Sequence, residues 1–81
     1  MPRIKRTNVP PCILRHLLDR IHDRGIPATQ LEELARWLDR EPEVCAGEWY
    51  KRFSGMIVCG EGEWVKTFLL PSQAPKGKRI D

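Results

Sequence analysis

A histidine and two arginines stand four residues apart near the start of the chain, at His16, Arg20 and Arg24. In a helix this spacing puts the three side chains in one row. A histidine can move protons near neutral pH, and arginines can stabilise the charge that develops on a phosphate. The row therefore indicates an anion site, and phosphodiester cleavage without a metal is a reaction that these residues could perform.

Lys66, Thr67 and Arg52 in the C-terminal half could complete such a site, if the last strand lies close to the first helix. Otherwise His16 is an exposed residue without chemistry, and the nearby Asp19 and Asp23 serve only as counter-charges for the arginines.

A short repeat is the second feature of interest: GEWYKRF at 47–53 returns as GEWVKTF at 62–68. Each copy is expected to open a β-strand, in which residues two apart face the same side. The tryptophan, lysine and phenylalanine of each copy would then share a face. Either the rings pack against helices, or they stack on bases while the lysines contact phosphates. The second alternative makes Trp49, Lys51, Arg52 and Trp64, together with Arg24, candidate nucleic-acid-binding residues.

The cysteines, Cys12, Cys45 and Cys59, form no CxxC pair, and only Cys12 has a histidine at helical spacing, His16. One such pair without a second is weak support for zinc. We therefore expect no metal site and no cofactor. The odd cysteine count favours reduced thiols in a cytoplasmic protein.

Two helices must position the first row of residues. In 11–24 the leucines and isoleucine recur at the helical period, between Pro11 and the stop signal Gly25. A second helix is predicted over 29–40, before Pro42. The short link between them predicts a helical hairpin, with Leu14, Leu18 and Leu31 on its buried faces.

After Pro42 the pattern changes to strands, at 49–53, 56–59 and 64–70. Glycine-containing turns separate them, although the first two could be one strand bulged at Gly55. The predicted fold is α+β: an N-terminal helical hairpin packed on a two- or three-stranded antiparallel β-meander.

The net charge of +3 is concentrated at the two ends. Residues 1–10 and 71–81 contain lysines, arginines and prolines without an apolar period, and they predict disordered basic arms around a single domain at 11–70. No leader sequence or apolar run of membrane-spanning length is present, so we expect no membrane association.

The run HLLDRIHDRGI at 16–26, followed by a Leu- and Glu-rich helix, resembles small prokaryotic domains of the barnase/RelE-like ribonuclease toxin superfamily. The ending GMIVCGEGEWVKTFLL resembles their final hairpin. The resemblance spans about 14–70. It implies RNA cleavage without a metal and a cognate antitoxin partner, and it assigns catalytic positions to His16, Arg20, Lys66 and Thr67.

Three functions follow as hypotheses. The protein is a toxin-type ribonuclease, a nucleic-acid-binding module without catalysis, or a protein-interaction domain whose histidine and arginines are ordinary surface residues.

Overall fold

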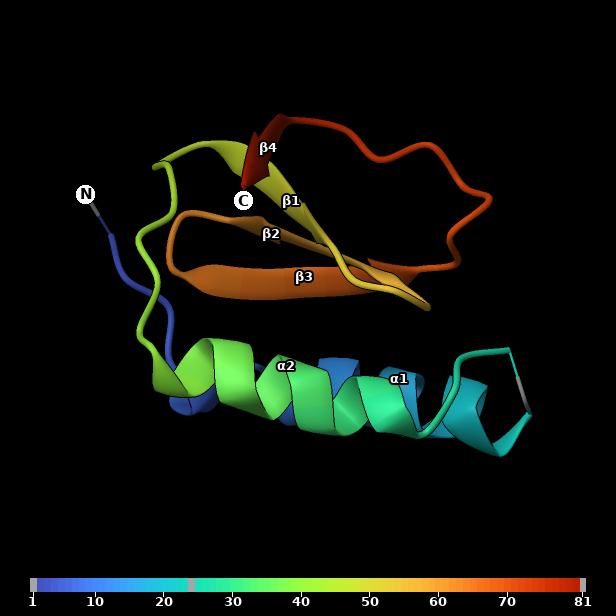
Figure 1. Cartoon of the computed structure of the whole chain (residues 1–81). Coiled ribbons are helices and arrows are strands. Elements are labelled where there is room, and N and C mark those ends of the chain that lie inside the picture. The colour runs from blue at the N-terminus through green and yellow to red at the C-terminus, as the bar shows by residue number, and fades with distance from the viewer. Residues whose placement is uncertain (1, 24, 81) are drawn as a thin grey trace.

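The chain forms two helices and one sheet in the computed structural model, which describes residues 2–23 and 25–80. A short 3-10 helix, η1 (Arg6–Asn8), precedes helices α1 (Pro11–His22) and α2 (Thr29–Asp39). The strands follow as β1 (Glu48–Arg52), β2 (Ile57–Glu61), β3 (Trp64–Leu69) and β4 (Lys78–Ile80). Both α-helices lie on the same side of the sheet (Figure 1). The predicted α+β class is confirmed.

The sheet has four strands in the order β3-β2-β1-β4, and it is mixed. β2 pairs with β1 and β3 in antiparallel fashion, whereas β4 pairs with β1 in parallel. The prediction of a simple antiparallel meander was therefore wrong. The error lies in the C-terminal segment, where β4 was not predicted. Three residues without apolar alternation give little strand signal in the sequence, and they become a strand only by pairing with the edge of β1.

The helices do not form the predicted hairpin. Leu14 and Leu18 of α1 remain 37% and 45% exposed, and Leu31 of α2 remains 37% exposed. These are the leucines that a tight hairpin would bury. The two helices instead dock separately on the sheet, and a groove of about 240 Å³ that Leu14 and Leu31 help to line remains beside them. The short link brings the helices to one side of the sheet without making them a packed pair.

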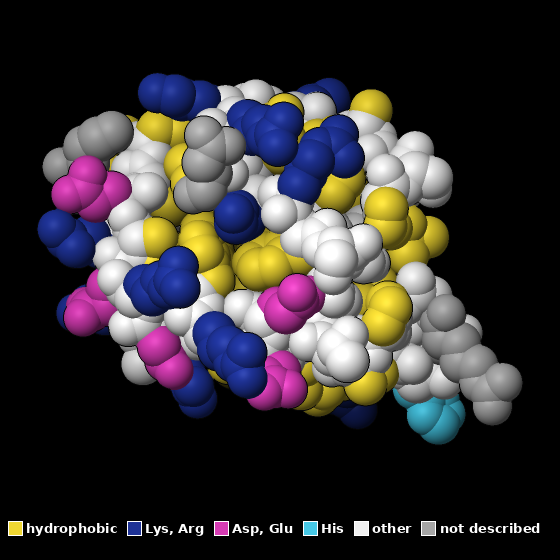
Figure 2. All heavy atoms as spheres, in the orientation of Figure 1, with side chains coloured by type: hydrophobic (Ala, Val, Ile, Leu, Met, Phe, Trp, Pro, Cys, Tyr) yellow, Lys and Arg dark blue, Asp and Glu magenta, His cyan; other side chains and the backbone are white. Residues whose placement is uncertain are grey.

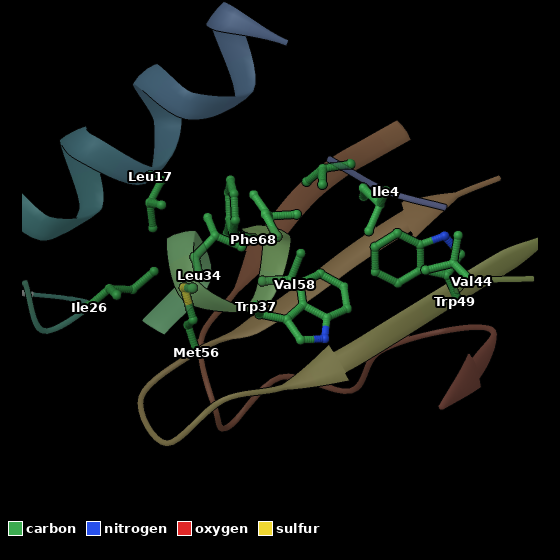
Figure 3. Packing of buried hydrophobic residues seen from close by; sticks show 12 residues of the cluster. Ile4, Leu17, Ile26, Leu34, Trp37, Val44, Trp49, Met56, Val58 and Phe68 are labelled. Atoms are coloured by element: carbon green, nitrogen blue, oxygen red, sulfur yellow. The ribbon is translucent and has the colours of Figure 1, made fainter. Parts of the chain in front are cut away.

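The core lies between the helices and the sheet (Figure 3). Leu17 reaches down from α1, and Leu34 and Trp37 reach from α2. Val58 and Phe68 meet them from the sheet. The apolar side chains supply most of the free energy that stabilises a domain of this size, at about 25 cal/mol for each Å² removed from water.

The two ends of the chain lie against this core where the structure describes them. The Ile4 side chain is fully buried, its backbone N–H donates to the Pro42 carbonyl at 3.1 Å, and Val44 N–H donates to the Pro2 carbonyl at 2.8 Å. At the other end Ile80 packs against the core from β4. The core therefore draws on residues outside the predicted domain limits of 11–70.

Candidate nucleic-acid interface

The predicted catalytic residues lie on two sides of the sheet. His16 is exposed and Arg20 is half-buried on α1, in the helical layer. Lys66 and Thr67 are exposed on β3 between the buried Val65 and Phe68. The sheet thus separates His16 and Arg20 from Lys66 and Thr67, and no single site collects the four. Arg24 lies outside the described residues.

A β-bulge explains why Lys66 and Thr67 point the same way. The β2–β3 register pairs Gly60 with Val65 and Cys59 with Thr67, so Lys66 is an additional residue on β3. A bulge of this kind turns two successive side chains toward one face. Both side chains therefore point away from the helices. The bulge also breaks the expected alternation, in which Trp64, Lys66 and Phe68 would share a face.

The two tryptophans of the repeat differ in exposure. Trp49 is fully buried, its indole Nε1–H donates to the Gly62 carbonyl at 2.8 Å, and its ring centroid is 5.9 Å from that of Trp37. Trp64 is 48% exposed. Trp49 is therefore a core residue and has no free face for a base, whereas Trp64 is about half exposed.

Lys51 and Arg52, the other predicted binding residues, meet α2 at a groove that we call the α2–β1 groove. It has a volume of about 330 Å³ and is lined by Glu33, Arg36, Trp37, Arg40, Lys51, Arg52, Phe53 and Ser54. In Figure 2 the face formed by α2 and β1 shows an apolar hollow with Lys and Arg side chains around it. Phe53, which is partly buried, contributes the aromatic surface, and its ring meets that of the buried Trp37 edge to face at 5.8 Å.

Cations dominate the rim of this groove. Arg40, Lys51 and Arg52 form no ion pair with any carboxylate of the described residues. Lys51 Nζ lies 5.8 Å from the centroid of the Phe53 ring, and the Arg52 guanidinium lies 5.8 Å from that of Tyr50. Because these contacts are with rings and not with carboxylates, Lys51 and Arg52 can still bind an anionic group.

Arg36 also lines the groove but already has a partner, because its Nη2 donates to Glu32 at 2.6 Å. Both side chains of this pair are largely exposed, so it contributes only about 0.3–0.5 kcal/mol and can open at little cost. Arg36 and Arg40 stand four apart near the C-terminal end of α2, where a positive charge is favourable for the helix itself. Helix stability thus accounts for part of the basic character.

A polar network fixes one end of the groove. The buried Gln30 side chain accepts from Gly55 N–H at 2.9 Å and donates to Ser54 Oγ at 2.9 Å and to the Glu33 carboxylate. The Ser54 hydroxyl also donates to Glu33 at 3.1 Å. A buried amide needs such partners, since an unsatisfied one costs about 1–3 kcal/mol. The network ties α2 to the turn after β1, so the two walls of the groove are held together.

Outside this groove, three titrating groups have pKa values that their surroundings shift. The hydrogen bond from Arg6 holds the pKa of Asp39 below its usual value, and Asp39 in turn raises the pKa of Arg6. Partial burial in β2 raises the pKa of the Cys59 thiol. A raised thiol pKa disfavours the reactive thiolate, so this cysteine is poorly suited to nucleophilic chemistry at neutral pH.

Among residues 2–23 and 25–80, no three or more His, Cys, Asp or Glu side chains are grouped as a metal site would require. No helix in that same part of the chain is long and apolar enough to cross a membrane.

Of the residues that line this groove, Lys51 and Arg52 are named from the sequence as candidates, whereas Trp37, Arg36 and Arg40 are not. Arg40, the C-cap of α2, is three positions after Trp37 and four after Arg36, which puts basic side chains beside the ring on one side of the helix. This spacing can be read from the sequence. The sequence does not reveal which strand packs beside this side of the helix.

Compared with protein-family models, curated proteins and solved structures, the chain has no match in any of the three. The resemblance to barnase/RelE-like toxins therefore stays a prediction.

Proposed function

We propose that the protein is a non-enzymatic module that binds single-stranded RNA through the α2–β1 groove. The observation that carries this proposal is the set of three cations without described ion-pair partners, Arg40, Lys51 and Arg52, around an aromatic floor. Single-strand binders combine these two elements, because cations follow the phosphate backbone while rings contact the bases.

The charges of the groove favour an anion. Its rim carries Arg36, Arg40, Lys51 and Arg52 against the single carboxylate of Glu33, which is already engaged by Gln30 and Ser54. Each phosphate that a cation neutralises releases counterions from the nucleic acid, which makes binding dependent on salt. Binding by this surface should therefore weaken steadily as salt concentration rises.

Binding alone is better supported than cleavage. Cleavage as the resemblance implies it needs His16 and Arg20 beside Lys66 and Thr67, and these pairs lie on different sides of the sheet. Toxin-type ribonuclease activity and an antitoxin partner remain predictions of the resemblance, and the binding experiment can also detect cleavage.

The test is fluorescence anisotropy of a labelled single-stranded RNA, titrated with the full chain at several salt concentrations. We expect log K to fall linearly with log salt, with a slope of about −0.7 for each phosphate contacted. Arg40→Ala and Arg52→Ala should each reduce the magnitude of this slope by about 0.7. Arg15→Ala, at an exposed arginine of α1 outside the groove, is the matched control.

Salt-independent affinity, or an equal loss in the Arg15→Ala control, would contradict the proposal. The same RNA is examined for cleavage in EDTA, beside His16→Ala. Cleavage by the wild type that His16→Ala abolishes would replace the binding proposal with the ribonuclease.

A further inference from the structure

A second cavity lies on the face of the sheet that is turned away from the helices. Residues 70–77, which we call the strap, connect β3 to β4, and in Figure 1 this segment passes above the sheet while the helices lie below it. Between the strap and the sheet is a cavity of about 300 Å³. It is lined by Glu48, Trp49, Cys59, Gly60, Lys66, Thr67, Leu69, Ala74 and Lys76.

The bulge in β3 and the end of the strap shape this cavity. The bulge turns Thr67 toward it together with Lys66. Gly77 has a φ of 97°, and a Cβ added there would lie 2.5 Å from the Glu48 carbonyl oxygen. The strap therefore seats closely on the backbone of Glu48, and a side chain at position 77 would prevent this. Lys76 and Glu48 are brought to the same cavity by that contact.

Two opposite charges in the cavity lack an ion-pair partner among the residues that the structure describes. Neither Glu48 nor Lys76 forms an ion pair within residues 2–23 and 25–80, and they do not pair with each other. Lys66 does have a partner, since its Nζ lies 3.0 Å from Glu61. That pair is exposed, so it is weak and neutralises Lys66 without occupying the cavity. A carboxylate and an ammonium thus remain available at separate positions.

The rest of the lining is mainly apolar. Leu69, Ala74 and the Cys59 thiol contribute to the walls, and burial raises the pKa of Cys59, which favours the uncharged thiol. The Thr67 hydroxyl adds one polar group that can donate or accept a hydrogen bond. The cavity is at the small end of ligand pockets, which are roughly 300–1,000 Å³. A small ligand with an apolar body and both charges fits these groups.

We propose that this cavity binds a zwitterionic ligand, a free α-amino acid with an aliphatic side chain. Its carboxylate pairs with Lys76 and accepts from the Thr67 hydroxyl, and its ammonium group donates to Glu48. The aliphatic side chain lies against Leu69 and Ala74. Hydrogen bonds between oppositely charged groups are the strong ones in such sites, so both ends of the ligand matter. This site lies across the sheet from α1 and is separate from the α2–β1 groove.

The experiment titrates the ¹⁵N-labelled full chain with L-leucine and follows the backbone amide signals by NMR. N-acetylleucine keeps only the negative charge and leucinamide keeps only the positive one. We expect leucine to shift the signals of Cys59, Thr67 and Leu69. N-acetylleucine and leucinamide should each bind with an affinity at least about tenfold lower than that of leucine. Glu48→Gln should lose the discrimination against N-acetylleucine, and Lys76→Met the discrimination against leucinamide.

Lys78→Met is the control, because Lys78 is an exposed lysine of β4 that does not line the cavity. Its affinity for leucine should equal that of the wild type. The spectrum of each variant without ligand reports whether it is folded, and Lys76→Ala replaces Lys76→Met if that variant is not. No shift at the three signals up to saturating leucine, or equal binding of all three compounds, would overturn the proposal.

Discussion

The two copies of the repeat share five residues of seven and end in opposite environments. In GEWYKRF the tryptophan is fully buried, and in GEWVKTF it is 48% exposed. The phenylalanines differ in the other direction, because Phe68 is buried and Phe53 only partly so. Identical residues in the same order therefore do not fix which side of a strand faces the core.

Position in the sheet accounts for the difference. β1 lies between β2 and β4, and its Trp49 sits opposite Gly60, whose missing side chain leaves room for the indole ring. β3 is an edge strand, and its bulge interrupts the alternation after Val65. As a result Lys51 lies beside the aromatic floor of the α2–β1 groove, whereas its counterpart Lys66 lines the cavity under the strap.

The largest predicted effect separates the tryptophans. Trp49→Ala removes a buried ring and a hydrogen bond to Gly62, and should lower the free energy of unfolding by about 3–5 kcal/mol. Trp64→Ala should lower it by about 1 kcal/mol or less, because half of that ring is already in water. Urea unfolding followed by circular dichroism gives both values. Equal losses would show that the two copies are structurally equivalent after all.

The glycines that open the two copies provide the next comparison. Gly62 has a φ of 57°, where an added Cβ costs about 1–2 kcal/mol. A Cβ on Gly47 would meet nothing within 4 Å, and its φ lies outside the left-handed region. We therefore expect Gly62→Ala to lower the urea midpoint clearly and Gly47→Ala to leave it unchanged or slightly higher. The reverse order would contradict the assigned turn.

The lysines at the same position of the two copies, Lys51 and Lys66, provide a test of the proposed RNA binding. Lys51→Ala should weaken RNA binding several-fold and reduce the salt slope by about 0.7, the value of one phosphate contact on a single strand. Lys66→Ala, in the same place of the second copy, should change neither quantity. Anisotropy titrations at matched salt decide this. A larger loss for Lys66→Ala would move the RNA surface to the other face of the sheet.

The smallest predicted effect concerns Cys59, which lies on β2 between the two copies. Burial raises its pKa in the folded state, so the folded protein holds this proton more tightly than the unfolded chain. The resulting stability is complete below the ordinary thiol pKa and is lost as pH rises through the folded-state pKa.

The difference in urea midpoint between wild type and Cys59→Ala should therefore shift against the wild type as pH rises across that range. Cys59 should also react more slowly with iodoacetamide than the exposed Cys12 does, which mass spectrometry of the labelled peptides can measure. A faster reaction at Cys59 would show that the thiol is not shielded.

The sequence predicted the parts of this fold that depend on local patterns. The helices, the first three strands and the α+β class follow from apolar periodicity and from turn residues. It did not predict β4, because Lys78–Ile80 become a strand only when the edge of β1 accepts them. The helical hairpin failed for a related reason, since Leu14 and Leu31 have the correct period but line a shared groove and stay 37% exposed.

The candidate sites were predictable to a smaller extent. Lys51 is a candidate because the repeat puts it on one strand face with Trp49 and Phe53, and both Lys51 and Arg52 line the α2–β1 groove. Trp37 and Arg40 come from a helix far away in sequence, and only tertiary packing brings them to β1. The pairing of His16 with Lys66 rests on residue types and on the resemblance to the toxin superfamily. Residue types do not reveal that a sheet lies between two groups.

Strand β4 is short, and its contacts with β1 span only 49–51. Few hydrogen bonds hold it, so it should open more often than the β2–β3 hairpin, and the amides beneath it should exchange with solvent sooner. Each opening uncovers the backbone N–H and C=O groups along the edge of β1, which are the groups that recruit strands from other molecules. The C-terminal strand is thus the cover that keeps this edge from templating aggregation.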